Sequence, residues 1–200
     1  MGSTIVTLSL SGNHFDGFLG GGNSNASINF IYGNLDVFSD TPATYLHYAT
    51  TGNRYVSYAA RNYFKLYTSM NRYQVLIPDS TNLIFSLSGQ IASGNLNSAE
   101  QFYLGGPTGV KAYPIAQGSG SNGAMGTLEL KQKLPLNTTA SGFVGAGAVQ
   151  QYVNTFPDWQ GQTHAPNTYA LADTGLGLNF KYKGFNVDGS SNSQFKTLLK

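Results

Sequence analysis

Residues that could do chemistry are few and scattered in this 200-residue chain. The chain has no cysteine, which excludes a thiol nucleophile, a disulfide framework and a cysteine-ligated zinc site. Its 3 histidines, His14, His47 and His164, stand far apart, and none has the short spacing that brings two imidazoles onto one metal ion. We therefore expect no metal site and no bound cofactor.

The carboxylates do not indicate hydrolytic chemistry. Paired-carboxylate catalysis needs two such groups roughly 5–10 Å apart across a substrate, but the few acidic residues here mostly border predicted turns. Glu100 has no acidic neighbour, and we interpret it, like Asp173 and Asp188, as a solvated carboxylate. Nucleophile-elbow and glycine-rich phosphate-binding motifs are missing from the sequence. We predict that the protein is not an enzyme.

Composition narrows the class of protein further. Charged residues make up 10% of the chain, against about 25% in ordinary soluble domains. The formal net charge of +2 is too small to indicate a nucleic-acid partner. An aromatic content of 13% argues against disorder. No apolar run approaches the roughly 18 residues that a membrane-spanning helix needs.

Alternation with period two is the strongest local pattern, and it is typical of strands with one apolar and one polar face. Turn-type clusters separate the alternating segments, at 20–25, 39–42, 78–82, 117–123, 155–166 and 188–192. At most one helical turn is expected, within 95–102. The chain is thus predicted to be all-β and antiparallel, with about ten strands. The alternating apolar positions are Val6, Leu8, Leu10, Ile28, Phe30, Tyr32, Leu83, Phe85, Leu87, Ile91, Leu128, Leu130, Leu134, Val144, Ala146, Ala148, Tyr152, Leu176, Leu178, Phe180 and Tyr182.

The polar face decides between the architectures that fit this pattern. It carries mostly Ser, Thr, Asn, Gln and Gly, and its few charges are Glu129, Lys131, Lys133 and Lys181. An apolar, aromatic-rich outside with a polar inside is the pattern of a transmembrane β-barrel. Two alternatives stay open: a plain outer-membrane pore, and a soluble β-sandwich that binds glycans through Tyr side chains and Trp159.

One segment, 103–126, is predicted to be a long loop. Gly105, Gly106 and Pro107 favour a sharp bend, because glycine allows positive φ and proline fixes its own φ. Lys111 follows near the tip. A lone ammonium among apolar and glycine residues needs an acidic partner if the tip is buried.

With its flanks, this segment resembles the two-partner secretion transporters of bacterial outer membranes, of the haemolysin-activator and haemagglutinin-exporter type. That family has a Leu-Gly-Gly run followed by Val-Arg-Gly-Tyr or Val-Arg-Ala-Tyr-Pro at a loop tip, and this chain has Leu104 to Gly106 and then Val110 to Pro114. The matched motif residues are Gly105, Gly106, Pro107, Val110, Lys111, Ala112 and Tyr113. Weaker matches are Gly89, Gln90, Leu96, Ser98, Glu100, Phe102, Asp16, Gly20 to Gly22, Asn25, Gly33 to Asp36 and Gly175 to Leu178.

The resemblance implies a sixteen-stranded outer-membrane barrel whose loop folds into the lumen. In that family the loop arginine pairs with a carboxylate on the inner wall, and an unfolded secreted partner of the adhesin or haemolysin class is exported without nucleotide. Residues 1–200 would then be a barrel portion in contact with outer-membrane lipid and not with nucleic acid.

Two departures from the family pattern bear on the loop. The arginine is replaced by Lys111, which keeps the charge but loses the planar fork. The Asp-x-Gly expected on a following strand is Gly145-Ala146-Gly147, so Glu129 remains as the candidate partner of Lys111.

The length of the chain does not decide how the barrel is completed. Ten strands are fewer than sixteen, and an open sheet edge cannot stay in lipid. The chain is therefore a fragment, a reduced relative or one piece of a barrel that other chains complete.

Overall fold

The computed structural model describes residues 2–36, 59–60, 62–115, 117–156, 159–160, 166–182 and 185–199. These residues confirm the predicted all-β, antiparallel fold with ten strands, and one turn of 3-10 helix, Ser98–Glu100, lies within the expected segment. Within the described ranges, no helix is long and apolar enough to cross a membrane. The strands are β1 (Gly2–Asp16), β2 (Gly22–Asp36), β3 (Asn62–Ile77), β4 (Thr81–Ala92), β5 (Phe102–Tyr103), β6 (Ser119–Gly120), β7 (Asn122–Leu134), β8 (Thr138–Gln150), β9 (Thr168–Tyr182) and β10 (Phe185–Leu199).

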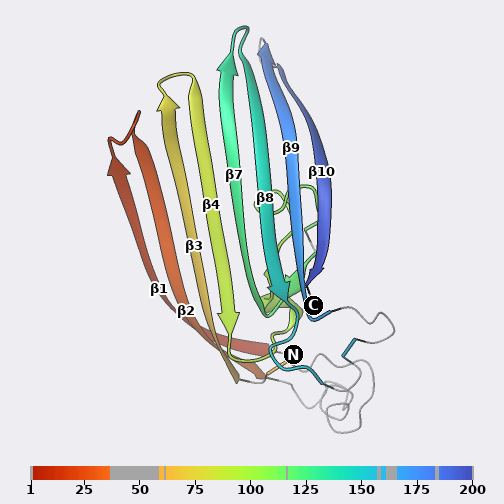
Figure 1. Ribbon diagram of the computed structural model, residues 1–200. Coiled ribbons are helices and arrows are strands. Elements are labelled where there is room, and N and C mark those ends of the chain that lie inside the picture. Colours follow the sequence, from red (N-terminus) through yellow and green to blue (C-terminus); the bar gives the residue numbers. More distant parts are fainter. Residues whose placement is uncertain are drawn as a thin grey trace.

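The long strands form one curved sheet with neighbours in chain order. It has 8 strands in the order β1-β2-β3-β4-β7-β8-β9-β10, and β5 and β6 form a separate pair. Short turns at 17–21, 78–80 and 135–137 lie at one end of the sheet, and the described residues of the long connections after β4 and after β8 lie at the other (Figure 1). Among the described residues, the outer edges of β1 and β10 pair with no strand, so the sheet is open.

One face of the sheet, here called the outer face, is apolar. Directly paired residues project from the same side, and the register pairs Leu8 with Phe30 and Phe30 with Leu66. Leu8 is 71% exposed and Leu176 is 72% exposed, so nothing in the described chain covers them. The predicted alternation has the correct phase throughout. The outer face carries Val6, Leu8, Leu10, Ile28, Phe30, Tyr32, Leu66, Phe85, Leu87, Leu128, Leu130, Val144, Leu176, Leu178 and Phe180.

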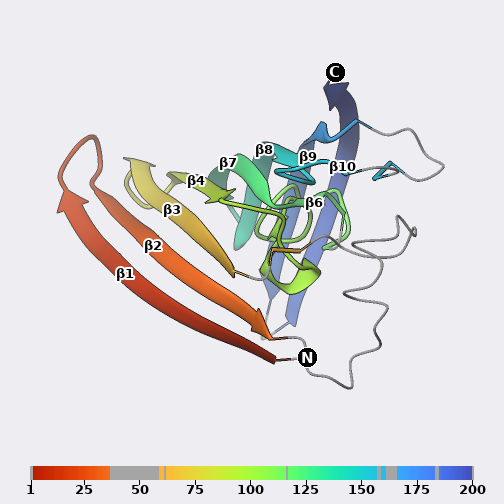
Figure 2. The same cartoon turned by 90° about the horizontal axis from the view of Figure 1, so that it is seen from below.

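The opposite, inner face is polar and holds the loop 93–121. Figure 2 shows this loop inside the curve of the sheet, against β4 and β7 to β10. The main core lies between loop and sheet, where Leu104 and Val110 of the loop pack with Val149 and Leu171 of the wall. The loop is therefore a packed part of the fold.

The apolar band of the outer face crosses the strands diagonally. One line of paired residues leads from Asp16 through Gln74 to Leu83, Leu130 and Leu176. This line is polar on β1 and β3 but apolar on β4, β7 and β9. Strands that are tilted relative to a horizontal band give this pattern, and strand tilt is what a barrel requires.

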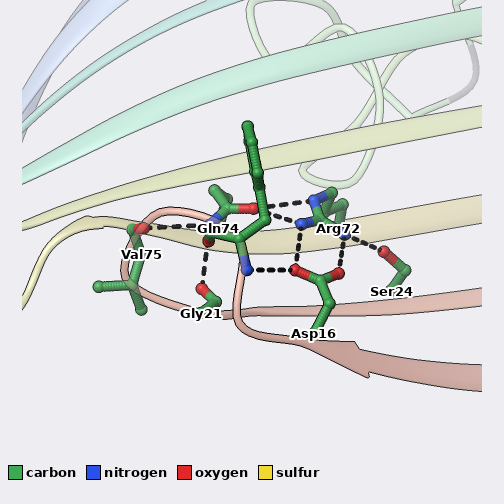
Figure 3. A network of polar contacts seen from close by, with 7 residues as sticks. Asp16, Gly21, Ser24, Arg72, Gln74 and Val75 are labelled. Atoms are coloured by element: carbon green, nitrogen blue, oxygen red, sulfur yellow. Dashed lines mark hydrogen bonds and ion pairs between the residues drawn. The ribbon is translucent and has the colours of Figure 1, made fainter.

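A polar network borders the band at the turn end of β1 to β3 (Figure 3). The Arg72 guanidinium donates to both carboxylate oxygens of Asp16, at 2.9 and 3.1 Å, and to Ser24 Oγ at 2.7 Å. Its Nε donates to Gln74 Oε1 at 3.1 Å, and Gln74 Nε2 donates to the Phe18 carbonyl at 2.7 Å. The β1–β2 turn is thereby fixed to β3.

Some sequence predictions of elements are wrong. The predicted turn 188–192 lies inside β10, because pairing with β9 overrides its turn-type composition. The loop spans 93–121 instead of 103–126, and residues 122–126 begin β7. Tyr152 lies beyond the end of β8. His47, His164, the cluster 39–42 and part of 155–166 fall outside the described residues.

Candidate functional site

The loop tip is a compact bend built on glycines. Gly106 has φ +114°, and a Cβ at Gly105 would lie 2.1 Å from the Pro114 carbonyl oxygen. Gly105 and Val110 form a β-bridge across the bend, and Val110 is fully buried. Pro107 is exposed at the turn of the bend. The motif residues thus shape a tip that points its next residue, Lys111, toward the wall.

The structure brings Lys111 and Glu129 together. Lys111 Nζ donates to Glu129 Oε2 at 2.7 Å, and the side chains are 30% and 19% exposed. The ammonium also lies 4.8 Å from the centre of the Phe143 ring. Lys131 Nζ stands 3.5 Å from the other Glu129 oxygen. The Glu129 carboxylate of β7 therefore binds the Lys111 ammonium at the tip. The contact is monodentate, because an ammonium lacks the planar fork of a guanidinium.

A second carboxylate holds the tip through its backbone. The amide of Ala112 donates to Asp173 Oδ2 at 2.8 Å, and the Ala112 carbonyl accepts from Gln194. Asp173 is buried in β9, so its interpretation as a solvated carboxylate is wrong. A Cβ at Gly145 would lie 2.5 Å from Asp173 Oδ1, so the space beside Gly145 is occupied by the carboxylate of the neighbouring strand.

The position of Asp173 on the polar face, but not its contact with the loop, could be predicted from the sequence. Extending the β9 alternation backward from Gly175 and Gly177 puts residue 173 on the polar face with Asn179. What the alternation cannot give is the contact, because Ala112 and Asp173 are 61 residues apart in the chain.

Tyr113 lies in the core under the tip. It is buried with Val149, Leu171 and Phe102. This burial raises the pKa of the Tyr113 phenol, so the side chain stays neutral at physiological pH. The residue after the cationic tip thus anchors the loop by apolar packing.

The base of the loop has its own ion pair. Lys65 Nζ on β3 lies 2.8 Å from Glu100 Oε2, and the side chains are only 9% and 17% exposed. The Glu100 carbonyl accepts from Lys65 Nζ at 3.1 Å and from Gln90 Nε2 at 3.2 Å. The interpretation of Glu100 as a solvated carboxylate is therefore wrong.

Cavities lie on both sides of the tip. One of about 940 Å³ opens toward the short turns and is lined by Lys111, Glu129, Lys181 and Asp188. A second, of about 390 Å³, lies between the tip and the inner wall of β3, β4 and β7. No group of three or more His, Asp or Glu residues in the described part of the chain could hold a metal ion.

Comparison with known proteins finds a likeness in fold to solved structures. No family model and no curated protein matches the chain. The chain is similar in fold to CdiB from Acinetobacter baumannii, with a TM-score of 0.47 and 15% sequence identity. The match covers 96% of this chain and 38% of the other, so this chain spans less than two fifths of that structure.

Proposed function

We propose that the chain is part of a bacterial outer-membrane β-barrel that exports a secreted partner protein, of the adhesin or haemolysin class, by two-partner secretion. The observation that carries this proposal is the loop. It folds onto the polar, concave face of a sheet whose other face is apolar, and it sets Lys111 against Glu129 on the wall. A plug held on an inner wall by an ion pair is suited to control passage through a conduit.

The two faces of the sheet support a membrane location. The outer face exposes a largely apolar surface, and among the side chains that the structure describes its charged residues, Asp16 and Arg72, lie next to the β1–β2 turn. In lipid, a basic residue near the midplane costs roughly 2–4 kcal/mol, so its exclusion from the band is expected there. Short turns at one end and long loops at the other are also typical of outer-membrane barrels.

Closure of the barrel belongs to the same proposal. The free edges of β1 and β10 would leave backbone groups without partners in lipid. The concave face is already occupied by the loop, whereas a barrel of about eight strands has an interior just filled by side chains. The conduit therefore needs further strands, to about sixteen in all. They come from another part of the polypeptide or from other chains.

The soluble β-sandwich is less well supported. A sandwich buries its apolar face against a second sheet, but in the described chain the packed loop lies on the polar face. Trp159 packs edge-on against Tyr152, with ring centres 6.0 Å apart, at the loop end of the sheet. A plain outer-membrane pore remains the second candidate, because the cavity of about 940 Å³ beside the tip is open enough for small solutes.

Two experiments test the proposal in order. The purified chain is expected to be monodisperse only in detergent, and a soluble monomer without detergent would exclude both membrane functions. The complete protein is then expressed in an outer-membrane host with its secreted partner, and the partner is expected in the medium. Diffusion of small solutes without secretion of the partner would favour the plain pore.

A further inference from the structure

The inner face divides into two halves of different chemistry. Apart from Lys65, the described charged side chains of this face lie on β7, β9 and β10. The described inner-face side chains of β1 and β2, and those of β3 from Tyr67 onward, carry no charge.

Three cross-strand hydrogen bonds organise the uncharged half. Ser9 donates to Asn29 at 2.7 Å, Ser27 and Ser69 are 2.9 Å apart, and Asn71 lies 3.4 Å from Asn25. These bonds hold short hydroxyl and amide side chains in place and leave their remaining groups facing the interior. The neutral wall is defined as Ser9, Asn25, Ser27, Asn29, Ser69 and Asn71.

The neutral wall is open, whereas the other half is covered. The loop lies over β4 and β7 to β10 and leaves the inner side of β1 and β2 free (Figure 2). The cavity of about 390 Å³ runs between Pro107 and Thr108 of the tip and Ser69 and Asn71 of the wall. This cavity is open space beside the loop, and its lining also includes the paired Lys111 of the tip and Glu129 of β7.

We infer that the neutral wall is the track along which an extended polypeptide passes while the loop stays docked on the other half. This inference rests on the proposed export function. Hydroxyl and amide side chains exchange weak hydrogen bonds with peptide groups of any sequence, so none of these contacts holds the passing chain for long. A wall without charge does not trap Lys, Arg, Asp or Glu of the passing chain. The ion pairs Lys65–Glu100 and Lys111–Glu129 need not break.

The absence of cysteine from the chain gives a direct test. Ser69→Cys puts a thiol on the neutral wall, and Ser141→Cys puts one on the inner face of β8, beside the larger cavity. Each variant is made in the complete protein, with the strands that close the barrel, placed in a planar bilayer and labelled with a maleimide-polyethylene glycol. The probe is a synthetic, unstructured Ser/Asn/Gly peptide whose current blockades are counted. The label at Ser69 is expected to reduce blockade frequency severalfold, and the label at Ser141 to leave it unchanged.

Charge substitution tests the neutrality of the wall. Asn71→Lys is expected to reduce blockades by a Lys-rich peptide about fivefold, the factor for about 1 kcal/mol of repulsion, and to increase those by a Glu-rich peptide. Ser141→Lys should change neither. If the label at Ser141 reduces peptide blockades and the label at Ser69 does not, the track is overturned while the export function stands. The track is also overturned if the label at Ser69 changes blockades by maltodextrin but not those by the peptide. If the complete protein forms no pore, the proposed function itself is overturned.

Discussion

Two contacts hold the loop tip: the ammonium of Lys111 and the backbone amide of the next residue, Ala112, each bind a carboxylate of the wall. Glu129 contacts the side chain at 2.7 Å, whereas Asp173 accepts the Ala112 backbone amide at 2.8 Å. The ion pair is partly exposed, and such pairs contribute at most about 1 kcal/mol. A buried amide without an acceptor costs about 1–3 kcal/mol. The backbone contact is therefore expected to matter more than the ion pair.

Glu129→Gln should loosen the tip only modestly. Loss of up to about 1 kcal/mol raises the undocked fraction by at most about fivefold. Hydrogen exchange of residues 104–118, together with single-channel conductance, measures the change. Lys133→Gln is the matched control, since Lys133 is exposed on the same face of the same strand. Identical exchange and conductance in the two variants would contradict a role for the Lys111–Glu129 pair.

Asp173→Ala should loosen the tip more than Glu129→Gln does. It leaves the Ala112 amide without its acceptor, so exchange in 104–118 should accelerate by about fivefold to a hundredfold. Thr174→Ala changes the next residue of β9 on the opposite face and serves as control. A smaller effect of Asp173→Ala than of Glu129→Gln would show that the side-chain pair is the main anchor.

At the scale of elements, the ion pair at the base of the loop is less exposed than the ion pair at its tip. Lys65 and Glu100 tie the 3-10 turn to β3, and Gln90 ties the same turn to β4. Removal of one partner from a buried ion pair costs about 3–5 kcal/mol, because the other charge stays buried and unpaired. The base is therefore the fixed end of the loop, and the tip is the end that can move.

Lys65→Met should release the base of the loop, with a loss of about 3–5 kcal/mol. Limited proteolysis within 93–121 and thermal melting measure the effect. The double variant Lys65→Met/Glu100→Leu should recover most of the loss, because no charge is then left buried without a partner. If the double variant is as labile as the single one, the ion pair is not what holds the base.

The alternation predicted the strands wherever the apolar residues alternated without interruption, as in Leu176 to Tyr182. It failed for β3 and β10, where Lys65 and Arg72 or the run Asp188 to Asn192 break the pattern. Both strands form because neighbours on the sheet pair with them along their whole length. Such pairing is a tertiary effect that local composition does not contain.

The candidate site was predictable to the extent that its residues are close in sequence or share a face. Glu129, 18 residues from Lys111, was predicted because the family resemblance implies a carboxylate on the wall and the alternation of Leu128 and Leu130 places Glu129 on the polar face. The Lys65–Glu100 pair spans 35 residues and joins a strand to a turn that no periodic pattern links. Its recognition needs the register of β3 and β4, which only the fold supplies.

At the scale of the whole molecule, the two faces of the sheet have the opposite roles to those in a soluble domain, where the apolar face is the buried one. Its apolar face is exposed and its polar face holds the packed loop. The buried core of the described chain therefore lies between the loop and the inner face of the sheet. The diagonal apolar band gives the strands their tilt relative to a membrane plane. Both features are expected if the outer face meets lipid, as proposed.

A pair of arginine substitutions distinguishes lipid from water around the sheet. Leu8 lies on the outer face and Thr7, its neighbour on β1, on the inner face, and both are exposed. In water, an arginine at either exposed position should be tolerated within about 0.5 kcal/mol. In a bilayer, Leu8→Arg should cost roughly 2–4 kcal/mol if it lies near the midplane, whereas Thr7→Arg should cost little. The folded fraction of each variant of the complete protein, with the strands that close the barrel, after refolding into phospholipid vesicles measures the difference. Equal folded fractions for the two variants would place the outer face in water and end the membrane proposal.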